Sequence, residues 1–305
     1  MSETQHQEML TAAILLTPAE LIVAIFAFVT LFGDAWFLVV GLALGYWIGP
    51  RSDETTRPAA ATGIAIAILA LSVVLSIKSY TAIPRPATMP IDPDGLPGTL
   101  VGFVAGELDS GGFSFPSGHA TGATAVYGSL GLLLTVGRRR WRHLLAGGAI
   151  GLISLSRLVL GVHYPRDVLA GMALGAGLVA GGLWVVRDGD RWRVDRGFLL
   201  AGIAAVVGVV VAWQGGHPEE LRHGMIGVGT AVGGGGVWYQ YGERLIAAPA
   251  VSVPVATGGL GVAGGLWVGA YEGLFGLVGA AVGSAVGVAI ILGLPLVESW
   301  RQKRT

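Results

Sequence analysis

Long apolar stretches separated by short polar segments run through the whole sequence. A helix needs about 20 predominantly apolar residues to cross the hydrocarbon core of a bilayer. We interpret ten stretches as candidate spans: residues 14–32, 35–49, 61–77, 118–136, 144–162, 168–186, 197–214, 224–239, 246–268 and 275–296. The second and the eighth are short, and four consecutive glycines at 233–236 weaken the eighth. The pattern predicts an all-α, polytopic transmembrane helix bundle.

Composition agrees with a membrane protein. The chain is 53% hydrophobic and 12% charged, whereas soluble domains carry about 25% charged residues. A net charge of zero gives no reason to expect nucleic acid as a partner. The absence of cysteine excludes disulfides, zinc–thiolate sites and cysteine nucleophiles. The first eight residues contain no Lys or Arg, so we expect the first span to be retained rather than cleaved as a signal peptide.

Glycine spacing indicates close packing between helices. Many of the 51 glycines lie inside apolar stretches, and pairs four residues apart occur at Gly171 and Gly175 and at Gly177 and Gly181. A third run, at Gly279, Gly283 and Gly287, has the same spacing. Small residues at this spacing let helix backbones approach closely. We favour packing within one chain over a dimer seam.

Basic residues divide unequally between the two faces that ten spans define. The face with the amino terminus carries fourteen: Arg51, Arg57, Arg138, Arg139, Arg140, Arg142, Arg187, Arg191, Arg193, Arg196, Arg244, Arg301, Lys303 and Arg304. The other carries five: Lys78, Arg85, Arg157, Arg166 and Arg222. Because basic loops favour the cytoplasm, we expect both termini inside a cell membrane and the sparse face outside.

The polar loop 187–196 divides the chain into a six-span unit, residues 1–187, and a glycine-rich extension of about four spans, residues 197–305. The extension shows no recognisable chemistry. Five polar residues gather where its first outer loop is expected: His217, Glu219, Glu220, Arg222 and His223. We favour a solvated loop there, with substrate contact or a metal as the alternative.

Three short segments carry the candidate chemistry. Lys78 precedes the pair Arg85-Pro86, residues 116–119 read Pro-Ser-Gly-His, and Ser156-Arg157 is followed by His163 and Asp167. The span count places all three on the sparse face. Taken singly, a histidine at a span end is usually interfacial, and Lys78 could snorkel to the headgroups. Their joint order and spacing favour a shared site.

Phosphoryl transfer needs cations, an in-line nucleophile and a proton donor. Lys78, Arg85 and Arg157 supply the cations. Ser117 and Gly118 begin a predicted helix, where free amides bind anions. We expect His163 to be the nucleophile, with its Nδ1–H bonded to Asp167. The second imidazole, His119, is then the general acid.

Other polar residues on this face have plainer interpretations. Asp34 follows Gly33 in what we predict to be a tight turn between the first two spans. We expect Ser114 to take part in loop packing. The loop 87–115 is acidic, with Asp92, Asp94, Glu107 and Asp109, and we interpret it as irregular. A solvated loop or lid is favoured there over a paired-carboxylate metal site.

These segments resemble the type-2 phosphatidic acid phosphatase superfamily over about residues 60–187. That superfamily includes membrane lipid phosphatases, polyprenyl diphosphate phosphatases and soluble vanadium haloperoxidases, of which the spans exclude the last. The resemblance implies the roles given above, a phosphohistidine intermediate, and no metal or other cofactor. Residues 1–187 are then a phosphatase core.

We therefore expect a phosphorylated lipid as substrate, hydrolysed at the external face. Two alternatives stay open: a phosphoryl or phospho-headgroup transferase using the same site, and a non-catalytic, transporter-like protein that binds phospholipids.

Overall fold

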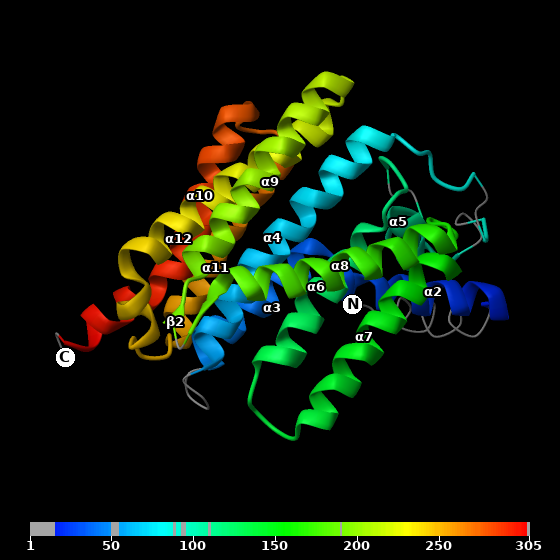
Figure 1. Ribbon diagram of the computed structural model, residues 1–305. Coiled ribbons are helices and arrows are strands. Elements are labelled where there is room, and N and C mark those ends of the chain that lie inside the picture. Colours follow the sequence, from blue (N-terminus) through cyan, green and yellow to red (C-terminus); the bar gives the residue numbers. More distant parts are fainter. Residues whose placement is uncertain are drawn as a thin grey trace.

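A computed structural model describes residues 16–49, 55–87, 90–92, 96–108, 111–189 and 191–303. Arg51, Asp94, Asp109 and Arg304, which the sequence interpretation used, lie outside the described residues. The described part is almost entirely helical, as Figure 1 shows. Five of its helices are long and apolar enough to cross a membrane, or six spans if the bent pair α2–α3 counts as one. The predicted fold class, an all-α polytopic bundle, is confirmed.

The elements follow the chain in a simple order. They are α2 (Pro18–Thr30), the 3-10 helix η1 (Leu31–Gly33), α3 (Ala35–Ile48), α4 (Thr56–Thr81), α5 (Gly98–Leu108), α6 (Gly118–Leu133), α7 (Arg139–Val159), α8 (Pro165–Val186), β1 (Arg187–Asp188), β2 (Arg191–Trp192), α9 (Val194–Gly215), α10 (Pro218–Ile246), α11 (Val253–Tyr271) and α12 (Gly276–Gln302). Each predicted span overlaps an α-helix.

Two segments differ from the prediction in secondary structure. The loop 87–115 contains the helix α5, which the sequence interpretation missed. Helix α10 starts at Pro218 and runs through the four glycines at 233–236 without a break. The polar cluster from Glu219 to His223 therefore lies on the first turns of a helix rather than in a loop.

The predicted tight turn at Gly33 and Asp34 is wrong. Between α2 and α3 the chain bends by 51° and does not reverse. Helix α2 begins at a Thr17 cap, and its residues Val23 and Ala27 pack against α5 and against Val162, next to His163. The first turn of α2 therefore lies on the face that carries the motifs, rather than on the opposite face as ten antiparallel spans required.

The extension packs directly on the preceding helices. Figure 1 shows α9 and α10 alongside α4, and one hydrophobic cluster runs from Leu38 to Leu294. Tyr46 Oη donates to the carbonyl of Leu292 at 2.9 Å, and Trp47 Nε1 donates to that of Ile291 at 2.7 Å. These bonds join α3 to α12 inside the core.

Arg57, counted above among the cytoplasmic loop charges, is fully buried. Its guanidinium donates to the carbonyls of Leu245 at 2.8 Å and Pro249 at 2.7 Å, and also to that of Ala248. The side chain therefore ties the first turn of α4 to the connection between α10 and α11.

Glycines bring some helix pairs into backbone contact. A Cβ at Gly171 would lie 2.7 Å from the carbonyl oxygen of Ser117, and one at Gly175 would lie 2.8 Å from that of Thr121. Helix α8 therefore packs closely on α6. Gly177 and Gly181, which share the spacing, have no such neighbour within 4 Å. The predicted helix packing within one chain is therefore confirmed for Gly171 and Gly175, whereas Gly177 and Gly181 face open space.

Candidate active site

The motif residues meet at one end of the bundle. Lys78 lies in the last turn of α4, Arg85 follows that helix, Gly118 and His119 begin α6, and His163 precedes α8. These five residues line a single cavity of about 360 Å³. Three segments far apart in the sequence therefore supply two imidazoles and two cations to one space.

His163 is held in the form that a nucleophile requires. Arg85 Nη1 lies 3.3 Å from His163 Nε2 and donates to the carbonyl of Val162 at 3.1 Å. A guanidinium can only donate hydrogen bonds, so Nε2 presents its lone pair toward the cations. Burial, with the positive charges of Arg85 and Lys78, lowers the pKa of His163 well below its ordinary value. The imidazole is therefore neutral at neutral pH.

The link from His163 to Asp167 passes through Ser114. His163 Nδ1 is 3.6 Å from Asp167 Oδ2, beyond a direct hydrogen bond. Ser114 Oγ lies 3.4 Å from that Nδ1 and donates a short hydrogen bond to Asp167 Oδ2. The same carboxylate oxygen accepts from the amide of Tyr164 at 2.9 Å, which fixes it at the start of α8. The direct bond expected between His163 and Asp167 is thus replaced by a relay.

His119 has a carboxylate partner that the sequence interpretation missed. His119 Nε2 and Asp34 Oδ1 are 2.8 Å apart. Asp34 is the N-terminal cap residue of α3, at the bend that follows α2. The bend carries this carboxylate to the first turn of α6. Asp34, interpreted above as a turn residue, is therefore part of the site.

Arg157 is buried beside this pair. Its Nη1 donates to Thr30 Oγ1 at 2.6 Å and lies 3.5 Å from Glu107 Oε2. Burial and the nearby Asp34 carboxylate raise the pKa of Glu107, while Arg157 opposes that rise. Helix α5, which carries Glu107, is thus joined to the site.

Asp34, Glu107 and His119 also offer ligand atoms that lie within 4.8 Å of one another, close enough to hold a metal ion. The guanidinium of Arg157 already places a positive charge against Glu107. We therefore interpret the group as an ion-pair cluster that positions His119 and Arg157.

Ser117 has a structural role. Its Oγ accepts from the amide of Ala120 at 3.4 Å as the cap of α6, and its own amide donates to the carbonyl of Asp167 at 3.0 Å. The expectation that the Ser117 amide is free to bind phosphate is wrong, because α8 takes up that donor. Gly118, the next residue in the sequence, does line the cavity.

The residues that sequence reasoning missed differ in the signal they carried. An ionisable residue between two apolar stretches, such as Asp34, is a functional candidate by default. No local pattern distinguished Ser114 or Thr30. Their partners lie 53 and 127 positions away along the chain.

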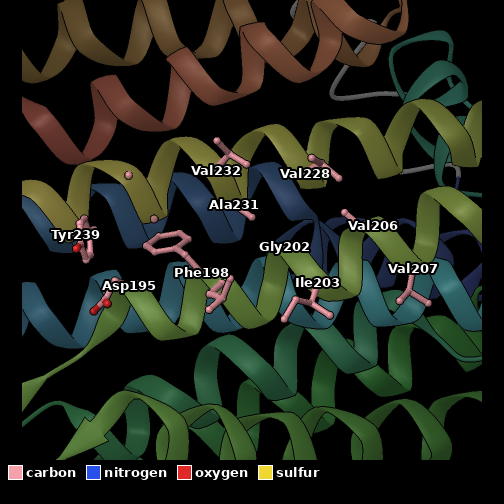
Figure 2. A pocket seen from close by; sticks show the side chains of 13 residues that line it. Asp195, Phe198, Gly202, Ile203, Val206, Val207, Val228, Ala231, Val232 and Tyr239 are labelled. Atoms are coloured by element: carbon pink, nitrogen blue, oxygen red, sulfur yellow. The ribbon is translucent and has the colours of Figure 1, made fainter.

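A separate groove lies between α9 and α10, and Figure 2 shows Phe198, Ile203, Val206 and Val232 along it. Its volume is about 740 Å³, and no motif residue lines it. Ile203 and Val232 are more than half exposed, as expected of side chains that face lipid.

Comparison with known proteins gives a family for the middle of the chain. Residues 59–191 match the PAP2 superfamily. The chain is similar to phosphatidylglycerophosphatase B of Bacillus subtilis, with 38% identity over 21% of this chain and 34% of that protein. It is 43% identical to the lipid A 1-phosphatase of Rhizobium johnstonii, over 21% of this chain and 24% of that protein.

A third relative is the decaprenylphosphoryl-5-phosphoribose phosphatase of Mycobacterium tuberculosis, with 43% identity over 21% of this chain and 32% of that protein. The chain thus spans about a quarter to a third of the length of these relatives. No solved structure gave a significant match. The matching segment contains Lys78, Arg85, the Pro116–His119 segment, Arg157, His163 and Asp167. Residues 59–191 thus match the PAP2 superfamily, in agreement with the resemblance carried by the motif segments.

Proposed function

We propose that the protein is a membrane phosphatase that hydrolyses a lipid phosphate or a polyprenyl diphosphate. The observation that carries the proposal is the cavity that holds both imidazoles, with Nε2 of His163 turned toward cationic side chains. This arrangement offers a neutral nucleophile, a charge-neutralising pocket and a second histidine that can donate a proton. Phosphoryl transfer needs these three parts.

In the first step, the Nε2 lone pair of His163 forms a bond to phosphorus. The bond from phosphorus to the lipid oxygen breaks, and that oxygen takes a proton from His119. Lys78 and Arg85 stabilise the negative charge on the phosphoryl oxygens, with Arg157 as a third cation behind them. In the second step, His119 takes a proton from water, the water oxygen bonds to phosphorus, and Nε2 of His163 leaves. Phosphate is released.

The substrate class rests on two further observations. The cavity lies at one end of a membrane bundle and continues between its helices. The relatives are named for phosphatase activity on three different lipids. What those lipids share is a phosphate ester or anhydride at the polar end of a hydrocarbon chain.

We also propose that the site faces outward. Residues 1–50 contain no Lys or Arg, so the bend at Gly33 does not alter the unequal division of basic residues. The start of α2 lies with the site, while the described end of the chain lies with the basic face, so this orientation places the two on opposite sides of the membrane.

Phosphate release by the purified full-length chain in detergent, on a panel of lipid phosphates and diphosphates, tests the function. We expect turnover by the wild type and a loss of at least about a thousandfold in His163→Gln, with a smaller loss in Asp167→Asn. Acid quenching with a ³²P-labelled substrate should trap a phosphohistidine. Unchanged turnover in His163→Gln would overturn the proposed role of His163. Binding of the lipids by the wild type without turnover would overturn the proposal and favour a binding protein. Phosphate recovered on an added alcohol instead of in water would favour a transferase.

A further inference from the structure

Two of the four helices that follow α8, α10 and α11, form one wall of the catalytic cavity. Besides the motif residues, the cavity is lined from α10 by His223, Ile226 and Thr230, and from α11 by Trp267 and Tyr271. These residues lie outside the segment that matches the PAP2 superfamily. Residues 59–191, which match the superfamily, therefore do not enclose the cavity by themselves. Helices α10 and α11 close its remaining side.

The wall is apolar away from the phosphate end. Opposite α10 and α11, helix α4 contributes Ile68, Leu71 and Leu75. A second cavity, of about 590 Å³, lies between α3 and α11 and shares Ala35, Val39, Trp267 and Tyr271 with the first. Trp267 and Tyr271 thus stand between a space that contains the imidazoles and a mostly apolar space beside α3, whose lining also includes Asp34 and Glu272.

The same wall carries a histidine, His223, which lines the cavity together with the motif residues. The His223 ring stacks on Tyr271 with ring centres 4.9 Å apart. His223 Nε2 is buried and has no hydrogen-bond partner among the described residues. Buried imidazole nitrogens are normally hydrogen-bonded, so this atom is suited to contact a polar group on a ligand.

The start of α10 also contacts the loop that precedes α6. Phe113, just before the Pro116–His119 segment, packs edge-on against His217 with ring centres 4.7 Å apart. The first turn of α10 is therefore fixed against the loop that carries Ser114.

We propose that the extension is the binding site for the substrate's hydrocarbon chain. The part of the hydrocarbon chain nearest the phosphate lies between α4 and the pair Ile226 and Thr230. The next part of the hydrocarbon chain passes Trp267 into the cavity beside α3. His223 contacts a polar atom near the phosphate, such as a second phosphate group. The ligand class is an amphiphile with its phosphate at one end of a long hydrocarbon chain. This inference rests on the proposed function.

The experiment compares substrates that share a phosphate and differ in chain length. For the wild type and each variant, kcat/KM is measured on a short, water-soluble alkyl phosphate and on a long-chain alkyl or prenyl phosphate. Trp267→Ala removes a large side chain that lines both cavities. Val39→Trp places a large side chain at the junction of the two cavities. We expect the ratio of long-chain to short-chain kcat/KM to fall about tenfold or more in each variant.

Matched controls use the same substitutions at exposed positions. Trp184 is 83% exposed on α8 and Val253 is 66% exposed on α11. Trp184→Ala and Val253→Trp should keep the wild-type ratio. His223→Phe should raise KM for a diphosphate more than for the matching monophosphate. Thermal unfolding of every variant identifies loss of fold.

The outcomes separate the two proposals. Wild-type turnover of both substrates, with ratios unchanged in Trp267→Ala and Val39→Trp, would overturn the inference and leave the proposed function standing. No turnover of either substrate by the wild type would overturn both.

Discussion

His119 and Asp34 form a hydrogen-bonded pair that joins two parts of the chain 85 positions apart. Asp34 lies before residue 59, outside the segment that matches the superfamily. A carboxylate that is hydrogen-bonded to one nitrogen of an imidazole fixes the orientation of the ring. Asp34 is therefore placed to hold His119 as the proton donor in the proposed reaction.

Replacing Asp34 by Asn should lower kcat by about tenfold to a hundredfold, part of the 10²–10⁴ that a general acid contributes. KM should change less, because Asp34 hydrogen-bonds to His119 and not to Lys78 or Arg85, the cations that line the cavity. Asp34→Glu should recover part of the activity, since it restores the charge. Asp188→Asn, at an exposed hairpin carboxylate, serves as the control. A wild-type kcat in Asp34→Asn would contradict this role.

The lowered pKa of His163 predicts a pH dependence of stability. Below the ordinary histidine pKa of about 6.5, the unfolded imidazole binds a proton that the folded one does not. Stability is therefore highest above pH 6.5 and falls on acidification, by up to about 1.4 kcal/mol for each pH unit. The drop in Tm between pH 7 and pH 5 should be smaller in His163→Gln than in the wild type. Equal drops would show that His163 titrates normally.

The sequence predicted the motif residues and left their partners unidentified. The spacing of Lys78, Arg85, His119, His163 and Asp167 was readable because each segment is short and local. Asp34 and Ser114 enter through contacts across the fold, which no local pattern encodes. Ser117 was misassigned because its motif position indicates a helix start but not which neighbouring helix uses its amide.

At the scale of elements, the apolar stretches predicted the helices well. Length and hydropathy suffice when each span is buried in lipid or in the bundle. They did not distinguish a reversal at Gly33 from a bend of 51°, since both need only a short break between two apolar runs. Helix α5 was missed because prolines and glycines on either side of it suggested irregular structure.

The contact of α8 with α6 gives a prediction for these elements. A Cβ at Gly171 would clash with the backbone of Ser117, so Gly171→Ala should push α8 away from α6 and separate His163 from His119. We expect a loss of about 1–3 kcal/mol in stability and a clear loss of kcat. Gly177→Ala, on the same helix and facing open space, should keep both. Equal activity of the two variants would show that this packing does not position the imidazoles.

At the scale of the whole molecule, the orientation in the membrane can be tested directly because the chain has no cysteine. Tyr80 is 82% exposed near the site, and Val136 is 51% exposed at the opposite end of α6. In intact cells, a membrane-impermeant maleimide should label Tyr80→Cys and should reach Val136→Cys only after permeabilisation. The reverse pattern would place the site inside.

The polar loop at residues 187–196, where we predicted the division, contains the β1–β2 hairpin. The sequence indicated where four further helices begin but not how they pack, since apolar surfaces carry no partner information. Besides the shared hydrophobic cluster, buried polar groups on α3 and α4 join them to the first helices.

Those contacts have an evolutionary consequence. Tyr46, Trp47 and Arg57 donate to carbonyls of α10, of α12 and of the connection between α10 and α11, and all three precede the superfamily segment. A lineage that lost those helices would leave the three donors without acceptors in a water-free interior, at a cost of about 1–3 kcal/mol each. An arginine at the position of Arg57, in the first turn of α4, should therefore be inherited together with the extension. Homologues that lack the extension should carry an apolar residue at that position.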